Sequence, residues 1–172
     1  TLAGSSKPQR KAIAEQIGIT QILSMLLSKS EKLQYVGCRC MIALVLENVI
    51  NQNKILEENG IDPLIRLLKL STTSHRVIAA TVDTIGALCV DIAHVNNERT
   101  QMDLIEKGAL ELLTNILEKP FNKEIQINTA HALACLLLNQ PEERLVDINY
   151  NLNLEFMLNL IIIDDLVRLL LV

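Results

Sequence analysis

Three glycine residues recur along the chain, and each precedes a run of paired aliphatic residues. The sequence reads Gly-Ile-Thr-Gln-Ile-Leu from Gly18, Gly-Ile-Asp-Pro-Leu-Ile from Gly60 and Gly-Ala-Leu-Glu-Leu-Leu from Gly108. The glycines are 42 and then 48 residues apart, and the polar segment 91–97 accounts for the longer second interval. A period of this length is typical of proteins built from stacked structural repeats.

The residues around each glycine predict a helix, a sharp turn and a second helix. Apolar residues lie about one turn before each glycine, and glycine adopts the left-handed conformation of a helix C-terminus at low cost. In the second unit, Asp62 is expected to be the N-cap of the next helix and Pro63 its first residue. Two helices joined at a fixed angle are therefore expected in each unit.

A longer helix is expected about seventeen residues after Gly60 and after Gly108. Residues 77–88 and 125–136 have matching apolar positions at offsets of zero, eight and eleven, which is the spacing of one buried helix face. The first unit has the same helix within 33–46, with a register that starts at either Leu33 or Tyr35. With only 2% aromatic residues and many Leu, Ile and Glu, the chain is predicted to be all-α, a stack of three-helix repeats.

The repeat pattern divides the chain into about three units within residues 1–141. Their approximate bounds are 9–50, 51–97 and 98–141, and residues 142–172 are expected to be a degenerate or truncated fourth repeat. Within that segment, 166–170 matches 64–68, and the apolar stretch 154–163 is expected to be either a core helix or a partner-binding helix. Because the chain begins at Thr1, it is expected to be a piece of a longer protein, whose other repeats or domains would be its neighbours.

Charge and cysteine content exclude several classes of function. Residues 1–46 carry six basic and two acidic side chains against an overall net charge of −4, so no continuous basic stripe for nucleic acid is expected. No apolar stretch is long enough to cross a membrane. The four cysteines lie in apolar helical patterns, which predicts reduced, buried thiols and an intracellular protein, cytoplasmic or nuclear: Cys38, Cys40, Cys89 and Cys135.

No residue pattern predicts catalysis, a cofactor or a metal. His75, His94 and His131 are expected to be surface or groove imidazoles, without a Cys, Asp or Glu at ligand spacing. Adjacent carboxylates such as Glu57 and Glu58 diverge on a helix, so they form no acid–base pair. Phosphate-binding glycine loops and nucleophile motifs are absent from the sequence.

Residues 9–139 resemble the armadillo-repeat family. The resemblance lies in the glycine after a short helix, in the Gly-[Ile/Ala]-x-x-[Leu/Ile]-[Leu/Ile] motif, and in a third helix that begins with Val or Ile and ends with pairs of a small residue and Leu. It implies a right-handed α-solenoid of armadillo-type three-helix repeats. The function that it implies is a scaffold that binds a partner protein along a concave groove lined by the third helices. The alternative is a structural spacer or a regulatory module within a larger multidomain protein.

The resemblance also implies where a partner would lie. In peptide-binding armadillo proteins the third helix carries a Trp and, one turn later, an Asn that pairs with the partner's backbone. This chain has no Trp, and Ala or Cys at the Asn positions cannot bind an extended backbone, so a helical segment or a folded domain is the expected partner. The groove candidates at these positions are Arg39 and Ala43, Asp83 and Ala87, and His131 and Cys135.

Overall fold

The computed structural model describes residues 7–69, 73–90, 95–119, 121 and 123–140. Within these residues the chain forms helices joined by short turns, with a single isolated antiparallel bridge between Val90 and Asn96. The helices are α1 (Lys7–Ile17), α2 (Ile19–Leu27), α3 (Glu31–Val45), α4 (Val49–Glu57), α5 (Ile61–Lys69), α6 (His75–Cys89), α7 (Glu98–Glu106), α8 (Ala109–Glu118) and α9 (Lys123–Leu137). The predicted all-α class is confirmed.

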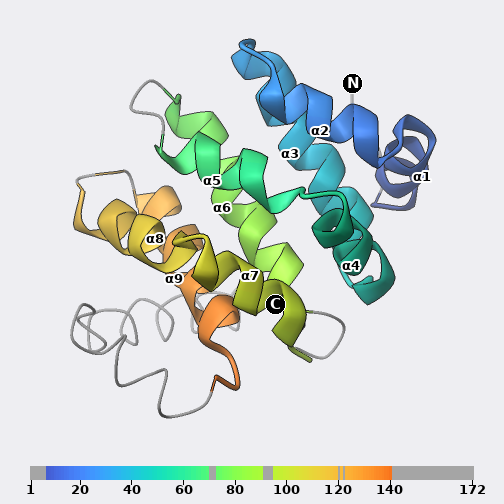
Figure 1. The fold of residues 1–172 in the computed structure, drawn as a ribbon. Coiled ribbons are helices and arrows are strands. Elements are labelled where there is room, and N and C mark those ends of the chain that lie inside the picture. The colour runs from blue at the N-terminus through green and yellow to red at the C-terminus, as the bar shows by residue number, and fades with distance from the viewer. Residues whose placement is uncertain (1–6, 70–72, 91–94, 120, 122, 141–172) are drawn as a thin grey trace, which may run out of the picture.

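The described helices come in threes, and the third of each set is the longest. The helices α3, α6 and α9 each have 15 residues, whereas the other six have between 9 and 11. The most extensive contacts are those between α6 and α9 and between α3 and α6, so these three helices pack side by side through the stack. Figure 1 shows the sets following one another in chain order, as in a helical solenoid. The exact repeat boundaries stay a prediction.

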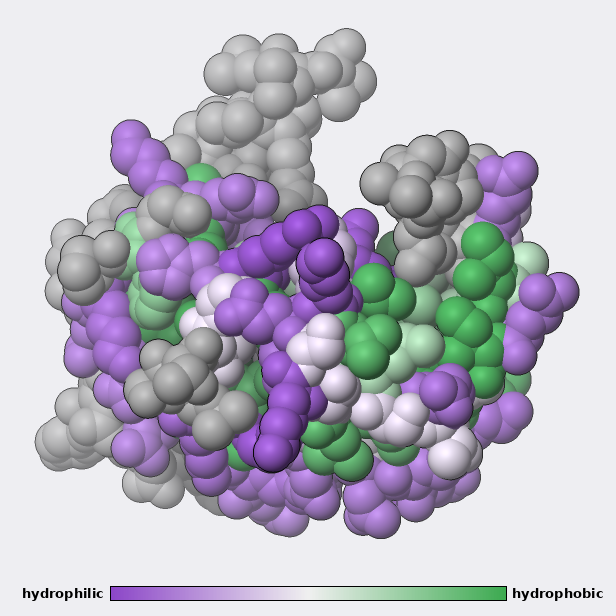
Figure 2. Space-filling view, turned by 90° about the horizontal axis from the view of Figure 1, so that it is seen from above, coloured by the Kyte–Doolittle hydropathy of each residue, from purple (hydrophilic) through white to green (hydrophobic). Residues whose placement is uncertain are grey.

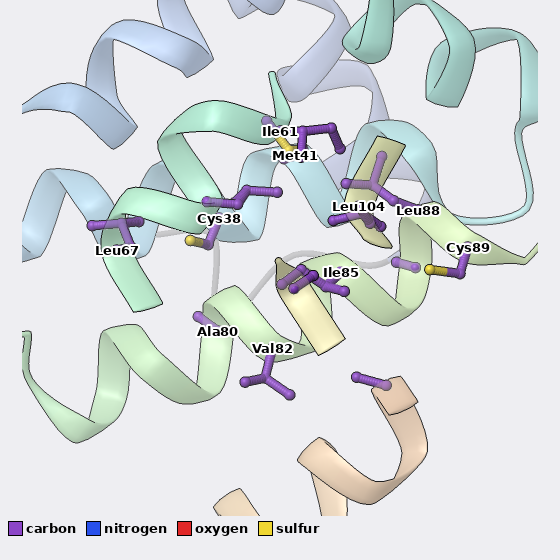
Figure 3. Packing of buried hydrophobic residues seen from close by; sticks show 14 of the residues in the cluster. Cys38, Met41, Ile61, Leu67, Ala80, Val82, Ile85, Leu88, Cys89 and Leu104 are labelled. Carbon is purple, nitrogen blue, oxygen red and sulfur yellow. The ribbon is translucent and has the colours of Figure 1, made fainter. Parts of the chain in front are cut away.

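The core is a continuous layer of aliphatic side chains between consecutive sets. Cys38 and Met41 of α3 lie with Ile61 and Leu67 of α5, and the same cluster continues through Ile85 and Leu88 of α6 to Leu104 of α7 (Figure 3). All of these side chains are fully excluded from solvent. Because each set covers the apolar face of the next, stability resides in the contacts between sets.

One of the three glycines, Gly108, has the left-handed helical backbone that the sequence predicts, with ψ of 22°, whereas Gly18 combines a positive φ with an extended ψ of 159°. Gly18 and Gly108 have φ angles of 79° and 82°. In the middle unit Asn59, with φ of 56°, occupies the left-handed position instead. The amide of Gly60 then donates to the Ile55 carbonyl and the amide of Asn59 to the Leu56 carbonyl, the two hydrogen bonds of a Schellman motif.

Gly60 is present because of crowding and not because of its φ angle. A Cβ atom on Gly60 would lie 2.5 Å from Ile55 Cγ2 and 2.9 Å from the Ile55 carbonyl oxygen. The predicted left-handed role of Gly60 is therefore wrong. The segment from the N-cap Asn48 to Gly60 is one residue longer than the segment from the N-cap Asn97 to Gly108 in the third unit. The left-handed position therefore falls on Asn59, and asparagine tolerates that conformation better than most residues.

The predicted start of the helix after Gly60 is also wrong. The helix α5 begins at Ile61, so Asp62 and Pro63 lie within its first turn and Asp62 is not the N-cap. The Asp62 amide donates to the Asn59 carbonyl, which extends the turn directly into the helix. The Asp62 carboxylate instead forms an ion pair with Lys107 Nζ at 2.7 Å, which joins α5 to the turn before α8.

A buried glutamine in the first helix of the second and third sets ties each set to its own long helix. Gln52 Nε2 donates to the carbonyls of Ala87 and Val90 at 3.0 and 2.7 Å. Gln101 Nε2 donates in the same way to the carbonyls of Cys135 and Leu138 at 2.7 and 3.1 Å. These carbonyls lie at the C-terminal ends of α6 and α9, where helical carbonyls have no intrahelical partner.

The side-chain oxygens of the same glutamines accept two further hydrogen bonds, of which the one from Asn97 connects neighbouring sets. Asn97, the N-cap of α7, donates from Nδ2 to Gln52 Oε1 at 2.9 Å, and Gln140 Nε2 donates to Gln101 Oε1 at 3.1 Å. Gln52, Gln101 and Asn97 are all buried. We call these four side chains the amide ladder, because they repeat one hydrogen-bonding pattern along the stack.

The polar segment that lengthens the second interval leaves the stack intact. The amide of Asn97 donates to the carbonyl of Cys89 at 2.7 Å, so the chain returns to the end of α6 immediately before α7 begins. His94, the candidate fourth repeat at 142–172, and the stretches 154–163 and 166–170 lie outside the described residues. In the part of the chain that is described, no helix is long and apolar enough to cross a membrane.

Candidate functional site

The structure decides the register of the three long helices. Arg39, Asp83 and His131 are each the ninth residue of a 15-residue helix, α3, α6 and α9 respectively. Leu33, Val77 and Ile125 are each the third residue, so the register that starts at Leu33 holds and the one at Tyr35 does not. The three ninth-position side chains therefore come from equivalent places on helices that lie side by side.

A hollow of about 370 Å³ opens on the surface formed by these long helices. Its lining comes entirely from α3, α6 and α9, and we call it the third-helix hollow. The residues that line it are Tyr35, Arg39, His75, Arg76, Ala79, Ala80, Asp83, Glu124 and Ile125. The lining includes two arginines and two carboxylates, so its positive and negative charges are equal in number. They are not all paired, because among these described residues only Arg39 and Asp83 form an ion pair.

Arg39 and Asp83 face each other across the boundary between α3 and α6. Arg39 Nη1 lies 3.9 Å from Asp83 Oδ2, with side chains 42% and 33% exposed. Burial is the main influence on Asp83 and raises the pKa of its carboxyl group. The Arg39 charge and a hydrogen bond with Asn128 of α9 lower this pKa, whereas the Glu124 charge raises it. The ion pair is long and half-exposed, so it contributes little to stability.

Arg76 and Tyr35 form the second contact between α3 and α6 in the hollow. The guanidinium carbon of Arg76 lies 3.9 Å from the centre of the Tyr35 ring, within the range of a cation–π interaction. Next to Arg76 in the sequence, His75 forms an edge-to-face contact with Phe121, with ring centres 5.0 Å apart and an interplanar angle of 72°. Aromatic contacts thus hold both residues at the N-terminal end of α6.

The structure brings some of the predicted groove residues together and leaves others below the surface. Arg39 and Asp83 form an ion pair, and His131 is exposed on the next helix. Ala43 is half-buried, whereas Ala87 and Cys135 are only 8% and 6% exposed. Little of Ala87 and Cys135 is therefore available to a partner.

One prediction about histidine is corrected by the structure. His131 has a cysteine one helical turn later, and Cys135 Sγ lies 3.9 Å from Nδ1 and 3.8 Å from Nε2 of His131. The statement that no histidine has a cysteine at ligand spacing is therefore wrong, because residues four apart share a helix face. Among the described residues, no group of three or more His, Cys, Asp or Glu side chains is placed to hold a metal ion.

All four cysteines are free and buried, which confirms the prediction of buried thiols. Burial raises the pKa of the Cys38 thiol to about 11, although contacts with Thr81 and Thr84 lower it. Burial also raises the pKa values of Cys40 and Cys89. Thiols that stay protonated at neutral pH are poor nucleophiles and poor metal ligands.

Sequence reasoning missed several residues of the hollow that lie nearer the N-termini of the long helices than the family positions do. Tyr35, Arg76 and Glu124 were not among the groove candidates, and His75 was expected only as a surface or groove imidazole, because the family positions lie one to two turns further along each helix. A usable signal was present, since Tyr35 is one of only two tyrosines in the chain. Tyr35 packs partly against the apolar core, and its ring is also in contact with Arg76.

The face seen from above is mostly polar, with a limited apolar area (Figure 2). Figure 2 shows hydrophilic side chains over most of the view from above, and apolar side chains gathered on the right, the side on which Figure 1 places α1. Among the residues that the structure describes, the large exposed apolar side chains are Ile13, Leu27, Leu33, Leu46, Val49, Ile50 and Val95. Six of these seven belong to the first fifty residues.

Comparison with known proteins identifies relatives that carry the expected repeat. The chain is 39% identical over 130 residues to the ankyrin and armadillo repeat-containing protein of Mus musculus, across 76% of this chain and 9% of that protein. It is also 39% identical over 80 residues to the protein of the same name from Homo sapiens, across 46% of this chain and 6% of that one. The chain thus spans less than a tenth of the length of these relatives. No protein-family model matches the chain.

A third relative and a solved structure extend the comparison. Kinesin-like protein KIN-UA of Oryza sativa subsp. japonica is 36% identical over 83 residues, 47% of this chain and 9% of that protein. The crystal structure of an engineered protein from the Northeast Structural Genomics Consortium matches with a TM-score of 0.69 at 18% identity, over 84% of this chain and 56% of that one. This likeness concerns the fold alone. The resemblance to armadillo-repeat proteins is confirmed by the names of the first two relatives and by the helical stack, which together support a repeat-based protein-interaction module.

Proposed function

We propose that the chain is a non-enzymatic scaffold that binds a partner protein on the face formed by α3, α6 and α9. One observation carries this proposal: three long helices, in matching register, present charged and exposed side chains around a single hollow. Rigid stacked repeats suit this use, because a solenoid offers a long surface without a conformational cost on binding.

The partner that fits this face is a helical segment or a folded domain. Ala43, Ala87 and Cys135 occupy the positions where a hydrogen-bonding side chain would be needed to bind an extended backbone. A helix or a folded domain satisfies its own backbone hydrogen bonds, so it loses nothing by lying against these residues. The relatives named for ankyrin and armadillo repeats agree with a role in protein binding.

The proposal is tested by selecting partners and then mapping them. A displayed library of natural protein fragments is selected on the purified chain, and dissociation constants are measured for Arg39→Ala and His131→Ala. Glu111→Ala and Glu118→Ala are the matched controls, because both residues are exposed on α8, away from the hollow. We expect binding to weaken at least about tenfold for a face substitution at a contact hot spot and to be unchanged for the controls.

Two results would argue against this function. Selected partners that respond to the α8 substitutions and not to those on α3 and α9 would move the binding site to another surface. Failure of the folded chain to select any partner would favour a structural spacer that only holds neighbouring domains apart.

A further inference from the structure

We propose that Arg76, held against Tyr35 at the rim of the third-helix hollow, anchors a carboxylate side chain carried by an α-helical segment of the partner. This inference rests on the proposed function, since it specifies what the partner places in the hollow. The residues concerned are not the ones that the family pattern indicates, and they come from the contacts in the structure.

Arg76 is positioned but not neutralised. Its guanidinium stacks on the Tyr35 ring at 3.9 Å, and among the described residues no hydrogen-bond acceptor or carboxylate is paired with it. Stacking occupies a face of the planar guanidinium and leaves the N–H groups at its edge free to donate. Because the ring already restricts the side chain, less entropy is lost when these groups bind a carboxylate with two parallel hydrogen bonds.

The other charges in the hollow determine how many negative groups can enter. Arg39 is already engaged by Asp83 at 3.9 Å, and Glu124 lies close enough to Asp83 to influence its ionisation. A second negative group would therefore meet two carboxylates at the Asp83 end of the hollow. A single carboxylate at the Arg76 end is attracted, whereas a polyanion such as nucleic acid is repelled at the opposite end.

The size of the hollow favours an anchoring side chain from a partner helix, whose backbone hydrogen bonds are already made within the helix. At about 370 Å³, it is at the low end of the roughly 300–1,000 Å³ range of ligand pockets. This volume accommodates a few side chains, and the rest of the partner must lie on the surrounding helices. An extended strand there would find no side-chain amide at Ala87 or Cys135, whereas a helix needs none.

The experiment uses the whole 172-residue chain and a displayed library of designed helical peptides randomised on one face. Selected peptides are synthesised, and each Asp or Glu is replaced in turn by Asn or Gln. We expect one carboxylate per peptide whose replacement weakens binding at least about tenfold, as expected for a charged hydrogen-bonded pair that loses one member. Arg76→Gln should cause the same loss.

Energetic coupling between the Arg76 substitution and the peptide substitution shows that the two side chains interact directly. In a double-mutant cycle, Arg76→Gln should add little to the loss caused by the peptide substitution, because both remove one interaction. The reversed pair, Arg76→Glu with a Lys in place of the peptide carboxylate, should recover binding. Tyr35→Leu should weaken binding several-fold through loss of the platform, and Tyr35→Phe should retain it.

Control variants separate the anchor from a general effect of positive charge or of folding. Arg99→Gln removes an arginine of α7 that is 61% exposed and pairs with Glu57 away from the hollow, and it should leave binding unchanged. Arg76 is itself exposed, so Arg76→Gln should keep the unfolding midpoint of the parent chain, which is measured by circular dichroism.

The contrary outcomes can be told apart. Peptides that bind the parent chain and Arg76→Gln equally, or additive losses in the cycle, overturn the anchor. If those peptides still lose binding on His131→Ala, the proposed function stands without the anchor. If the affinity of those peptides is unchanged by every substitution on α3, α6 and α9, both proposals fail. A parallel library of proline-containing extended peptides that yields the stronger Arg76-dependent binders would overturn the helical form of the partner.

Discussion

Asn97 donates a hydrogen bond of 2.9 Å to Gln52, although 45 residues separate them in the sequence. Asn97 is the N-cap of α7, and its Oδ1 also accepts from the Thr100 amide at 3.3 Å. Gln52 is fully buried and holds the end of α6. One pair of side chains therefore starts one helix, ends another and links two consecutive helical sets.

Gln52→Ala is expected to destabilise the chain strongly. The substitution removes the side-chain donor from the Ala87 and Val90 carbonyls, and it removes one of the two acceptors of the Asn97 amide, which keeps Asn53 Oδ1 at 3.2 Å. Each buried group left unsatisfied costs roughly 1–3 kcal/mol. We expect a loss of at least about 2 kcal/mol in the free energy of unfolding, measured by urea denaturation. Gln126→Ala is the matched control, because its amide makes only an exposed 3.5 Å contact with the Lys119 carbonyl. Equal stability of the two variants would show that the amide ladder does not hold the sets together.

Gly60→Ala is expected to destabilise by crowding. The added methyl group would collide with Ile55, whose Cγ2 and carbonyl oxygen lie 2.5 and 2.9 Å from the position of the new Cβ. Overpacking of this kind costs typically about 1–3 kcal/mol. Asn59→Gly, one residue earlier, should change stability by less than about 1 kcal/mol, because glycine accepts a positive φ readily. The reverse order of the two effects in thermal unfolding would contradict this assignment of roles.

The turn after α4 shows how far the sequence could predict the fold. The glycine period predicted the helix pairs, and the offsets in residues 77–88 and 125–136 predicted the long helices within about two residues of their start. The extra residue before Gly60 could not be interpreted, because whether asparagine or glycine takes the left-handed position depends on packing against Ile55. The amide ladder was likewise hidden, since nothing local distinguishes Gln52 from a surface glutamine.

The candidate site was predicted only in part, for a related reason. The family positions identified Arg39, Asp83 and His131, which the register confirms as equivalent. The contact of Arg76 with Tyr35 depends on the stagger between α3 and α6, because it joins the second residue of one helix to the fifth residue of the other. Stagger of this kind is set by the shape of the core and is not visible in the repeat pattern.

Asp83→Asn is expected to leave the chain as stable as before, or more stable, at pH 7. Burial raises the pKa of the Asp83 carboxyl group, so the folded state holds the proton more readily than the unfolded state, and ionisation at neutral pH weakens the fold. The half-exposed contact with Arg39 is worth only about 0–1 kcal/mol in return. The difference between variant and parent should shrink as the pH falls through the raised pKa, which urea denaturation at several pH values will show. Clear destabilisation at pH 7 would mean that the ion pair outweighs burial.

Stability is expected to fall in alkaline solution because of the buried thiols. The pKa of Cys38 rises from 9.0 to about 11 on folding, so between these values the unfolded chain loses a proton that the folded chain keeps. The contribution is complete below about pH 9 and is lost as the pH rises toward 11. Cys38→Ala should therefore lose stability less steeply than the parent over this interval. Parallel pH profiles for the two proteins would contradict this explanation.

The most direct test of the central claim is to map a bound partner by nuclear magnetic resonance. Backbone amide signals of the isotope-labelled chain are compared with and without the tightest fragment from the selection. The account predicts that the shifted signals cluster on α3, α6 and α9 around Arg39, Arg76 and His131, with α2, α5 and α8 unchanged. Shifts confined to α2, α5 and α8, with the signals of the long helices unchanged, would contradict it and place the binding surface on those shorter helices.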